Sequence, residues 1–407
     1  MDLNYSDRHK ALQDKVRAFI DANKHEAPSL ANVRKKPDRA TLAWQHKLLR
    51  YGYVGRTVPR QYGGFGAEPD VLESAIISQE FTGAGISGGI TNQGISMLVP
   101  TLLEVGTEKQ RVRWIAPTLQ GEIIWCQGYS EPGAGSDLAS LKTHAHVDGD
   151  DFVINGQKIW TSSAHFADMI FILVRTEPNA PKHRGISYLL VPMDSEGIEV
   201  RPLKTMTGQS TFNEVFFTDV RVATDQIVMD RGDGWKVANT TLKYERLLLG
   251  DPNKMLNRFH RIVKMMEDTR IGGRRLMDMP EYRDRLLRLQ GEVMASKYHG
   301  MRLLTEADKG EESGVKRLIV KYFGTVLAHK LSALAVDVMG EAGLAYDLSG
   351  LGTEDASLWN SDYMYDIGLI IGGGSSQIQK NIISERGLGM PREPRAEPQK
   401  AQKTMER

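Results

Sequence analysis

The chain has 407 residues, of which 41% are hydrophobic and 25% charged, and its formal net charge is +1. This balance is typical of a globular protein and excludes the strongly basic surface of a nucleic-acid-binding protein. The single cysteine, Cys126, excludes an intramolecular disulfide and a zinc site built from cysteines, and it favours a reducing compartment.

The N-terminal segment, MDLNYSDRHKALQDKV, is amphipathic and lacks the apolar core of a signal peptide. No apolar run approaches the length that we expect of a membrane span. We therefore expect a cytoplasmic protein without membrane or nucleic-acid contacts, and we predict no bound metal.

Helical spacing dominates the first part of the chain and predicts an N-terminal helical domain over residues 1–121. Gly106 suits the left-handed end of a helix, and Thr107 with Gln110 has the spacing of a capping box for the next helix. A capping residue at Ser6 precedes one apolar helical face, formed by Leu12, Val16, Phe19 and Ile20.

Residues 122–232 have a different composition and predict a middle β domain. Segments such as FVINGQKIW, DMIFILVRT and GISYLLVPM are rich in β-branched and aromatic residues, and turn residues separate them, as in VDGDD and DSEG. Asn155 and Gly156 are a strong signal for a two-residue hairpin turn. We therefore expect Ile159 and Trp160 to begin the returning strand.

Helical spacing returns over residues 233–389, for example at Leu286, Leu289 and Val293, and predicts a C-terminal helical bundle. The last residues, 390–407, are polar and contain prolines, so we expect a disordered tail. The order of helices, sheet and helices predicts an α+β fold with three domains.

Two segments of the β region have residues suited to a bound cofactor. In GYSEPGAGSDLASLKTHA, the glycines allow close approach of a ligand, and Ser130 and Ser136 supply hydroxyls. In NGQKIWTSSAHFAD, Trp160 and Ser162 place an indole and a hydroxyl where they suit a flat ring system. Each segment also has a plainer interpretation. The first would be a polar turn between elements, and the second would hold a core tryptophan on a sheet.

Together with VGTEKQ, FNEVFFTDVRV, GWKVANTTLKYER and SSQIQKNII, these segments resemble the acyl-CoA dehydrogenase family in order and spacing, over about residues 3–390. The resemblance implies that an N-terminal helical domain, a barrel-like middle β-sheet domain and a C-terminal four-helix bundle enclose FAD. It implies removal of a proton and a hydride from adjacent carbons of an acyl-CoA thioester, giving the trans-2-enoyl-CoA. Electrons then pass to an electron-transfer flavoprotein, as in fatty acid β-oxidation.

Carried over by position, the resemblance also implies roles for individual residues. Trp160 lies against the isoalloxazine, Ser162 hydrogen-bonds near its reactive nitrogen, and Ser136 also contacts the substrate. The remaining residues implied at the flavin and the thioester are Gln127, Tyr129, Ser130, Ser375 and Gln377.

The run IGGGSSQIQKNII lacks the catalytic glutamate of many family members, because that position is Gly373. The backbone amide remains, and we expect it to polarise the thioester carbonyl. A minority branch, including isovaleryl- and long-chain-type enzymes, carries the base on a bundle helix at the position of Glu245. Its neighbours three and four positions away on the helix are uncharged, namely Thr241, Leu242, Leu248 and Leu249.

Glu245 therefore has no ion-pair partner within its own helix, and a lone acid on an apolar stripe is expected to act as the general base. The alternative is a glutamate paired with a basic residue of another element. The neighbouring Arg246 matches a family arginine near the substrate. The alternative interpretation of Arg246 is a surface or structural ion pair.

Several positions depart from the family pattern. In TRIGGRRL, Gly272 stands where a phenylalanine packs on the neighbour's FAD, and Thr269 stands where an arginine sits. Arg270 is then the candidate for the FAD pyrophosphate. Three further replacements affect the expected FAD and CoA contacts, namely Asp337, Glu341 and Lys243.

The leading prediction is an active dehydrogenase that assembles as a homotetramer, a dimer of dimers, with acyl-CoA as substrate. Two alternatives stay open: an acyl-CoA oxidase-type flavoenzyme that uses oxygen, and a non-catalytic subunit of a mixed tetramer. No motif encodes the length of the acyl chain. A base on the helix, with small Gly373 in the loop, favours a branched, long or bulky acyl group.

Overall fold

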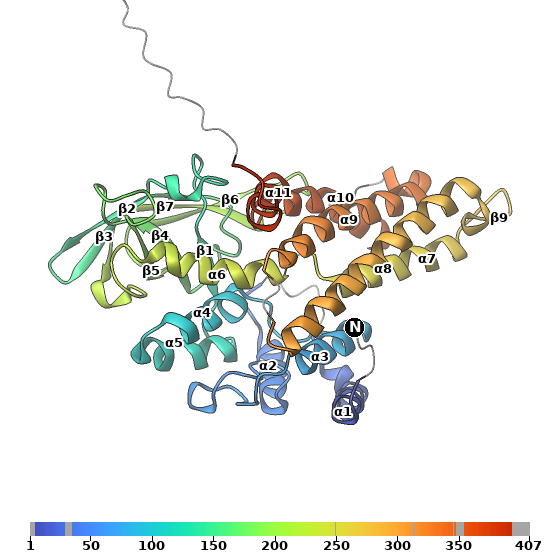
Figure 1. Ribbon diagram of the computed structural model, residues 1–407, viewed down its shortest axis with the longest axis horizontal. Helices are drawn as coiled ribbons and strands as arrows, with labels where there is room; N and C mark the ends of the chain where they lie inside the picture. Colours follow the sequence, from blue (N-terminus) through green and yellow to red (C-terminus); the bar gives the residue numbers. More distant parts are fainter. Residues whose placement is uncertain are drawn as a thin grey trace, which may run out of the picture.

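The computed structural model describes residues 5–28, 35–248, 250–311, 314–344, 346 and 354–392, and it leaves the side chains of residues 245–248, 308 and 354–357 undescribed. Helices, a sheet and a bundle of long helices follow one another along the chain (Figure 1). This order confirms the predicted α+β architecture. The predicted tail lies outside the described residues from residue 393 onward.

The N-terminal part is helical, as predicted. The Ser6 hydroxyl accepts a hydrogen bond from the His9 N–H (3.3 Å) and caps the first helix, and Val16, Phe19 and Ile20 are buried on its inner face. The helices of this part are α1 (Asp7–Asn23), α2 (Arg39–Tyr51), α3 (Val71–Gly83), α4 (Val99–Val105) and α5 (Glu108–Gln120). A π-helical turn, η4 (Gly94–Leu98), leads into α4.

The predicted capping box is confirmed, but the prediction for Gly106 is wrong. The Gln110 N–H donates to Thr107 Oγ1 (3.2 Å), and Gln110 Oε1 accepts from the Thr107 N–H (3.0 Å). Gly106 has φ −73° and ψ 156°, which is extended rather than left-handed backbone. A Cβ at this position would lie 2.7 Å from the Leu102 carbonyl oxygen. Close approach of backbone therefore explains this glycine.

The middle part is one mixed sheet in the order β1-β4-β2-β3-β7-β6, with β5 paired to β4. The strand pairs β1–β4 and β2–β4 are parallel, and the other pairs are antiparallel. The strands are β1 (Trp125–Gly128), β2 (His144–Asp148), β3 (Asp151–Lys158), β4 (Met169–Arg175), β5 (Ile186–Pro192), β6 (Ile198–Leu203) and β7 (Phe212–Ala223). Strands β4 and β5 are buried almost throughout, as their continuous apolar runs require.

The hairpin turn predicted at Asn155 and Gly156 is wrong, because both residues lie inside β3. The turn falls earlier, in the VDGDD segment between β2 and β3. Gly156 has φ +146° beside a register shift in the pairing of β3 with β7. A Cβ on Gly156 would lie 2.6 Å from the Cα of Thr143, so this glycine serves a bulge and a close strand contact.

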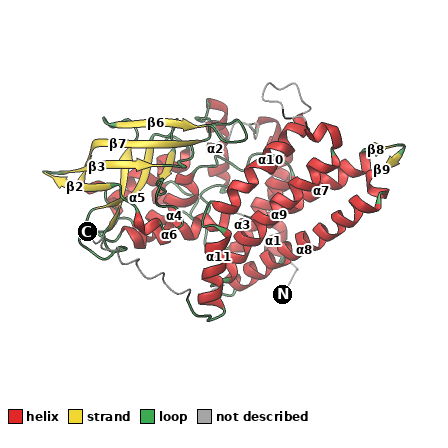
Figure 2. Ribbon diagram, turned by 90° about the horizontal axis from the view of Figure 1, so that it is seen from above, coloured by secondary structure: helices red, strands yellow, loops and turns green. Residues whose placement is uncertain are grey.

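The C-terminal part is helical, and α7 to α10 lie side by side as a four-helix bundle (Figure 2). Gly250, at φ +82°, lies in the link between α6 and α7, and the Asp251 side chain caps α7 by accepting from the Asn253 N–H (2.9 Å). The helices are α6 (Gly234–Leu248), α7 (Pro252–Asp268), α8 (Pro280–Asp308), α9 (Lys316–Val338), α10 (Glu354–Ile371) and α11 (Ser376–Ile382). A small hairpin, β8 (Arg270–Ile271) and β9 (Arg274–Arg275), joins α7 to α8.

One helix within the described ranges, α9, is long and apolar enough by length and composition to cross a membrane. This differs from the expectation drawn from the sequence. Half of its apolar window is buried inside the molecule, and α9 packs against α7, α8 and α10. Its apolar residues form much of the bundle core, including Leu327, Leu331 and Leu334. A core helix of this kind explains the apolar run.

Candidate active site

The loop that follows β1 is tied to β3 by a buried ion pair. Lys158 is fully buried, and its Nζ lies 2.7 Å from Glu131 Oε1. Glu131 also accepts hydrogen bonds from the N–H groups of Lys142 (2.6 Å) and Thr143 (2.9 Å). Burial lowers the pKa of Lys158 to about 8, because it outweighs the attraction of the Glu131 carboxylate. The pair fixes the segment that contains the predicted residues 127–130 against the strand that leads to Trp160.

Trp160 is held in an unusual conformation with its indole exposed. Its φ is +60°, which non-glycine residues rarely adopt, and its side chain is 57% exposed. The edge-to-face contact with Phe212 has a ring-centroid distance of 5.9 Å, and the preceding Ile159 N–H donates to the Ser130 carbonyl (2.9 Å). An exposed tryptophan in strained backbone is a candidate ligand contact, since packing alone does not require it.

The sheet meets the bundle at this tryptophan. Phe212 of β7 stacks on Tyr365 of α10, with ring centroids 6.5 Å apart. The hydroxyl of Tyr346 donates to the Thr207 carbonyl in the loop between β6 and β7. The predicted flavin contacts on the sheet are thus linked to the helix that runs into the glycine segment.

The glycine segment, residues 372–374, joins α10 to the short helix α11. Gly373 and Gly374 have φ values of +64° and +86°. The Ser375 hydroxyl caps α11 by accepting from the Ile378 N–H (3.3 Å), and Gln377 is exposed. Among the residues that the structure covers, no acceptor is found for the Gly373 N–H. This amide is therefore available to a bound oxygen atom.

Two residues that hold this segment were not predicted, namely Lys321 and Gln379. Lys321 Nζ donates to the carbonyls of Ile370 (3.1 Å) and Gly374 (2.7 Å). Gln379 Nε2 donates to the carbonyls of Gly373 (3.2 Å) and Gly374 (3.3 Å). The signal available in the sequence is a lysine within the apolar stretch LIVKYFGTVLA, because folding buries a cation only where it finds acceptors.

Helix α6, which carries Glu245 and Arg246, is anchored on α4. Thr241 is fully buried, and its hydroxyl lies 3.0 Å from that of Thr101. The side chains of Lys243 (2.9 Å) and Tyr244 donate to Glu104. Burial raises the pKa of Glu104, but these hydrogen bonds outweigh it and hold the pKa below its usual value. The side chains of Glu245 and Arg246 lie outside the described residues.

One predicted residue, Arg270, lies far from Trp160. Arg270 is exposed in the small hairpin at the far end of the bundle, where Gly272 (φ +55°) and Gly273 (φ +82°) form the turn (Figure 1). Ser136 is exposed on its loop. Asp337 pairs with Arg285 (2.7 Å). Within one chain, Arg270 therefore cannot share a site with Trp160.

Residues next to two of the predicted cofactor contacts fit the flavin that the resemblance implies. The buried hydroxyl oxygens of Thr161 and Ser376 have no hydrogen-bond partner in the described part of the chain. Thr161 follows Trp160, and Ser376 follows Ser375, so both stand next to predicted cofactor contacts. Buried hydroxyls normally have partners, and a flat ring edged with nitrogen and oxygen atoms would supply them.

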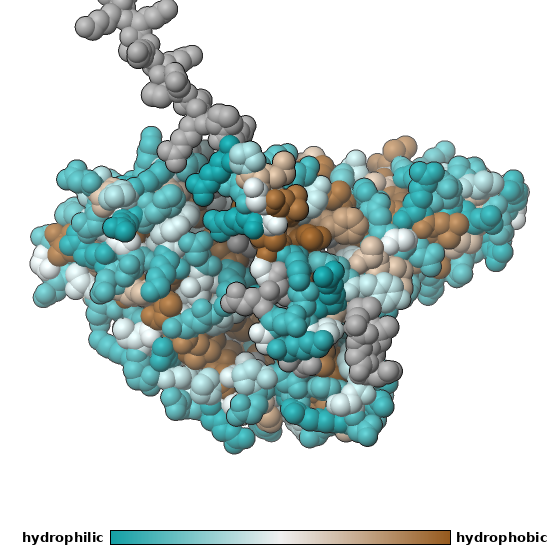
Figure 3. All heavy atoms as spheres, in the orientation of Figure 1, coloured by the Kyte–Doolittle hydropathy of each residue, from teal (hydrophilic) through white to brown (hydrophobic). Residues whose placement is uncertain are grey.

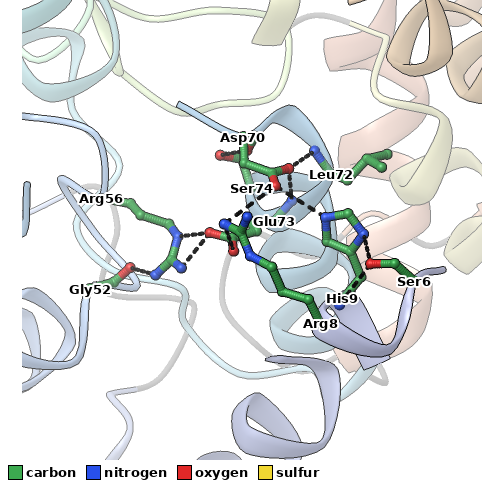
Figure 4. Close-up of polar contacts among 9 residues, drawn as sticks. All are labelled: Ser6, Arg8, His9, Gly52, Arg56, Asp70, Leu72, Glu73 and Ser74. Carbon is green, nitrogen blue, oxygen red and sulfur yellow. Dashed lines mark hydrogen bonds and ion pairs between the residues drawn. The ribbon is translucent and has the colours of Figure 1, made fainter. Parts of the chain in front are cut away.

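A cavity of about 440 Å³ lies in the N-terminal part, between α3, η4, α4 and the loop that carries Arg56. Arg56 and Arg8 converge on the buried Glu73 carboxylate and fix one wall (Figure 4). Burial raises the pKa of Glu73, but the hydrogen bonds from the two arginines outweigh it and lower the pKa. The apolar lining includes Ile77, Phe81, Ile95, Val99 and Leu103. The size and lining suit a ligand group larger than a short alkyl chain.

Exposed apolar side chains lie on α10 and on the segment that follows α11, and Figure 3 shows apolar surface where these elements approach the sheet. On α10, Tyr363, Ile367 and Ile371 are spaced four residues apart and share one face. Leu388 is 70% exposed. Contiguous apolar surface of this kind is typical of contacts between subunits.

Three family models match the chain in order. The model "Acyl-CoA dehydrogenase, N-terminal domain" matches residues 6–122, "Acyl-CoA dehydrogenase, middle domain" matches residues 126–220, and "Acyl-CoA dehydrogenase, C-terminal domain" matches residues 232–388.

Known relatives and solved structures match most of the chain. The acyl-CoA dehydrogenase IpdE1 of Mycobacterium tuberculosis is 37% identical over 353 residues, covering 86% of this chain and 88% of that protein. The structure of the Tcur3481-Tcur3483 steroid ACAD has a TM-score of 0.82 at 29% identity and covers 97% of this chain and 100% of that one. The ChsE4-ChsE5 complex from Mycobacterium tuberculosis has a TM-score of 0.81 at 30% identity, with coverage of 97% and 100%.

Proposed function

The chain belongs to the acyl-CoA dehydrogenase family, and on that premise we propose that it binds FAD and oxidises an acyl-CoA thioester to the trans-2-enoyl-CoA. The reaction breaks one C–H bond on the α-carbon and one on the β-carbon and forms a double bond between them. FAD, when bound, takes up the hydride from the β-carbon. The chain itself has to orient the thioester, remove the α-proton and exclude water.

The α-proton passes to the carboxylate of Glu245. Residues four apart on a helix share a face, and Thr241, one turn before Glu245, is buried against Thr101 of α4. This supports an inward-facing position for Glu245. Gly373 leaves the glycine segment without an acid, so no second carboxylate competes at that position.

The thioester carbonyl accepts a hydrogen bond from the Gly373 N–H, which stabilises the negative charge that develops on its oxygen as the α-proton leaves. The lack of an acceptor for this N–H among the described residues supports the assignment. The carbonyls of Gly373 and Gly374 are already engaged by side-chain donors, and the Gly372 N–H donates to the Gly368 carbonyl (2.8 Å), so the Gly373 N–H is the group that we assign to the ligand.

The single observation that carries the proposal is the exposed, strained Trp160 next to Thr161, whose buried hydroxyl has no hydrogen-bond partner among the described residues. Trp160 would lie against the isoalloxazine, with Ser162 near its reactive nitrogen. Gln127, Tyr129, Ser130, Ser375 and Gln377 complete the proposed flavin contacts.

The proposal is tested by the FAD content of the purified protein and by a screen of acyl-CoA thioesters with an artificial electron acceptor. We expect about one FAD per chain and reduction of the acceptor with at least one substrate. The same assay with oxygen as acceptor separates a dehydrogenase, which passes its electrons to an electron-transfer flavoprotein, from an oxidase. A protein that cannot take up FAD, or holds FAD without oxidising any thioester, would contradict the proposal.

We further propose that the acyl group is large and ring-bearing. One relative by structure is named a steroid ACAD, and the cavity of about 440 Å³ in the N-terminal part offers space for such a group. In the thioester screen, substrates with fused rings should have the highest kcat/KM. A preference for straight chains of four to eight carbons, on the order of tenfold, would contradict this assignment.

We propose that the active form is an oligomer in which a neighbouring subunit completes the FAD site, because Arg270 lies far from Trp160 within one chain (Figure 1). The apolar face of α10 supports such a contact. The neighbour is a second copy or a related chain, as in the two-component structures named above. Co-purification with a related chain, and FAD uptake only in its presence, would favour the mixed assembly and the non-catalytic subunit over the homotetramer.

A further inference from the structure

Residues 372–374, which lie between α10 and α11, are three consecutive glycines. They give this segment, next to the proposed thioester site, more backbone freedom than the two helices have. Glycine readily adopts the positive φ values of Gly373 and Gly374, but it loses the most conformational entropy when it is ordered. A segment that must present one N–H in a fixed direction therefore needs contacts from outside it. The structure supplies these contacts from α9 and α11.

Lys321 contacts both ends of this segment. Its side chain is fully buried, and its Nζ lies 3.1 Å from the carbonyl oxygen of Ile370, just before the glycines, and 2.7 Å from that of Gly374, at their end. A cation at the C-terminal end of α10 also interacts favourably with the helix dipole. One ammonium group thus fixes the entry and the exit of the segment at once.

Gln379 holds the same segment from the other side. Its Nε2 lies 3.2 Å from the Gly373 carbonyl and 3.3 Å from the Gly374 carbonyl, and its side chain is fully buried. A trans peptide unit is planar, so the Gly373 N–H lies in one plane with the Gly372 carbonyl. The fixed carbonyls of Ile370 before this plane, and of Gly373 and Gly374 after it, hold the chain on both sides of it. With both carbonyls directed at protein donors, the segment has little freedom left.

The next turn of α9 contacts the link that follows the helix of Glu245. Gly324 lies three residues after Lys321 and therefore on the same face of α9. A Cβ on Gly324 would lie 2.6 Å from the Cα of Gly250, which lies in the link between α6 and α7. The backbones of α9 and of this link therefore lie close together, with no side chain between them. One turn of α9 thus contacts both the glycine segment and the link after α6.

We infer that Lys321 is a positioning residue for the reaction: it holds the Gly373 N–H in place relative to the helix of the base, through the turn of α9 that also carries Gly324. This inference rests on the proposed dehydrogenation. Lys321 does not touch the reacting atoms, and it acts through the two carbonyls that it binds.

The test compares Lys321→Met with Lys330→Met in the full-length, FAD-loaded protein. Both changes replace a lysine of α9 by an apolar residue of similar length. Lys330 is a matched control, because its Nζ pairs with Glu292 (2.8 Å) and is 47% exposed. Two quantities are measured: steady-state kcat and KM with the best acyl-CoA, and amide hydrogen exchange in peptides that cover residues 368–382.

In Lys321→Met we expect kcat to fall by roughly 10- to 100-fold while KM stays within about threefold, because a misplaced donor weakens the transition state more than the bound substrate. Exchange in residues 372–379 should rise by roughly 10-fold or more, as expected for the loss of the two charge-assisted hydrogen bonds that Lys321 makes. Lys330→Met should change neither quantity. If Lys321 served stability alone, Lys321→Met would lower the melting temperature and the FAD content, and it would not lower kcat more than it changes KM.

If Lys321→Met does not fold, the same comparison is made with Lys321→Gln, because glutamine keeps an N–H donor on a shorter side chain. A folded variant with wild-type kcat, or with wild-type exchange in residues 372–379, would overturn the inference. If the wild type oxidises no acyl-CoA, the proposed function fails on its own. The exchange measurement then still decides whether Lys321 holds the glycine segment.

Discussion

Replacing Gly324 by alanine should destabilise the protein, whereas the same replacement at Gly291 should stabilise it slightly. Both glycines lie inside long helices, Gly324 in α9 and Gly291 in α8. A Cβ on Gly291 would meet no atom within 4 Å. A Cβ on Gly324 would lie 2.6 Å from both the Cα and the carbonyl oxygen of Gly250.

The size of the effect follows from these contacts. Alanine in a helix interior is favoured over glycine by about 0.5–1 kcal/mol, so Gly291→Ala should gain about that much. Ordinary contacts between carbon atoms are about 3.5–4.0 Å, so the new methyl group at Gly324 is about 1 Å too close to the backbone of Gly250. Overpacking of this kind costs roughly 1–3 kcal/mol. After the gain in helix propensity, Gly324→Ala should lose about 1 kcal/mol.

The assay is urea unfolding followed by circular dichroism, with flavin reduction measured on the same preparations. Gly324→Ala should also slow flavin reduction, because relief of the overlap moves the end of α6, and a shift of about 1 Å can cost on the order of 100-fold in rate. Gly291→Ala should keep the wild-type rate. Equal stability of the two variants would refute the proposed backbone contact between α9 and the link after α6.

Two further predictions concern the flavin contact and the buried ion pair. Trp160→Ala should weaken FAD binding by roughly 10-fold or more, because the variant loses a large exposed ring without disturbing the core. An unchanged FAD content after dilution and gel filtration would contradict the stacking role. Glu131→Gln should cost about 3–5 kcal/mol at pH 7, because Lys158 stays buried without its partner. Burial raises the pKa of Glu131, but Lys158 and the hydrogen bonds outweigh it, so the pKa is lowered in the folded protein. The contribution of Glu131 to folding stability is therefore present above the unfolded pKa of about 4.3, and it is lost as the pH falls through the folded pKa. The stability difference between wild type and variant should therefore shrink below about pH 4.3 in urea titrations, and a difference that grows there would contradict this sign.

Patterns that depend on neighbouring residues could be read from the sequence. The cap at Ser6 and the box formed by Thr107 and Gln110 both involve contacts within a few positions. The continuous apolar runs of β4 and β5 likewise predict buried strands without knowledge of their partners. The α+β order of helices, sheet and bundle follows from these local signals.

The wrong predictions concern glycines whose reason is distant or geometric. Asn155-Gly156 has the composition of a hairpin turn, yet Gly156 lies in β3, where Thr143, the residue before β2, leaves no room for a side chain. Gly106 is explained by the Leu102 carbonyl rather than by a left-handed backbone. Sequence composition alone does not distinguish a glycine needed for φ from one needed for space.

The candidate site residues stay predictions. Family motifs point to Trp160, Ser375 and the glycine segment, and the structure places Trp160 just after β3 and the other two between α10 and α11. They did not reveal the donors that order the segment, because Lys321 lies more than fifty residues away from Gly374 in the chain and carries no local motif. The roles of Glu245 and Arg246 stay predictions, since their side chains lie outside the described residues.

The most direct test of the proposed chemistry is the single-turnover rate of flavin reduction by the best acyl-CoA in Glu245→Gln, compared with wild type. Glu267→Gln is the control, because Glu267 is an exposed acid at the end of α7. If Glu245 removes the α-proton, its amide variant should bind FAD and acyl-CoA almost normally and lose roughly 10²–10⁴-fold in rate, while the control keeps the wild-type rate. A rate in Glu245→Gln close to that of wild type would contradict the assignment of the base.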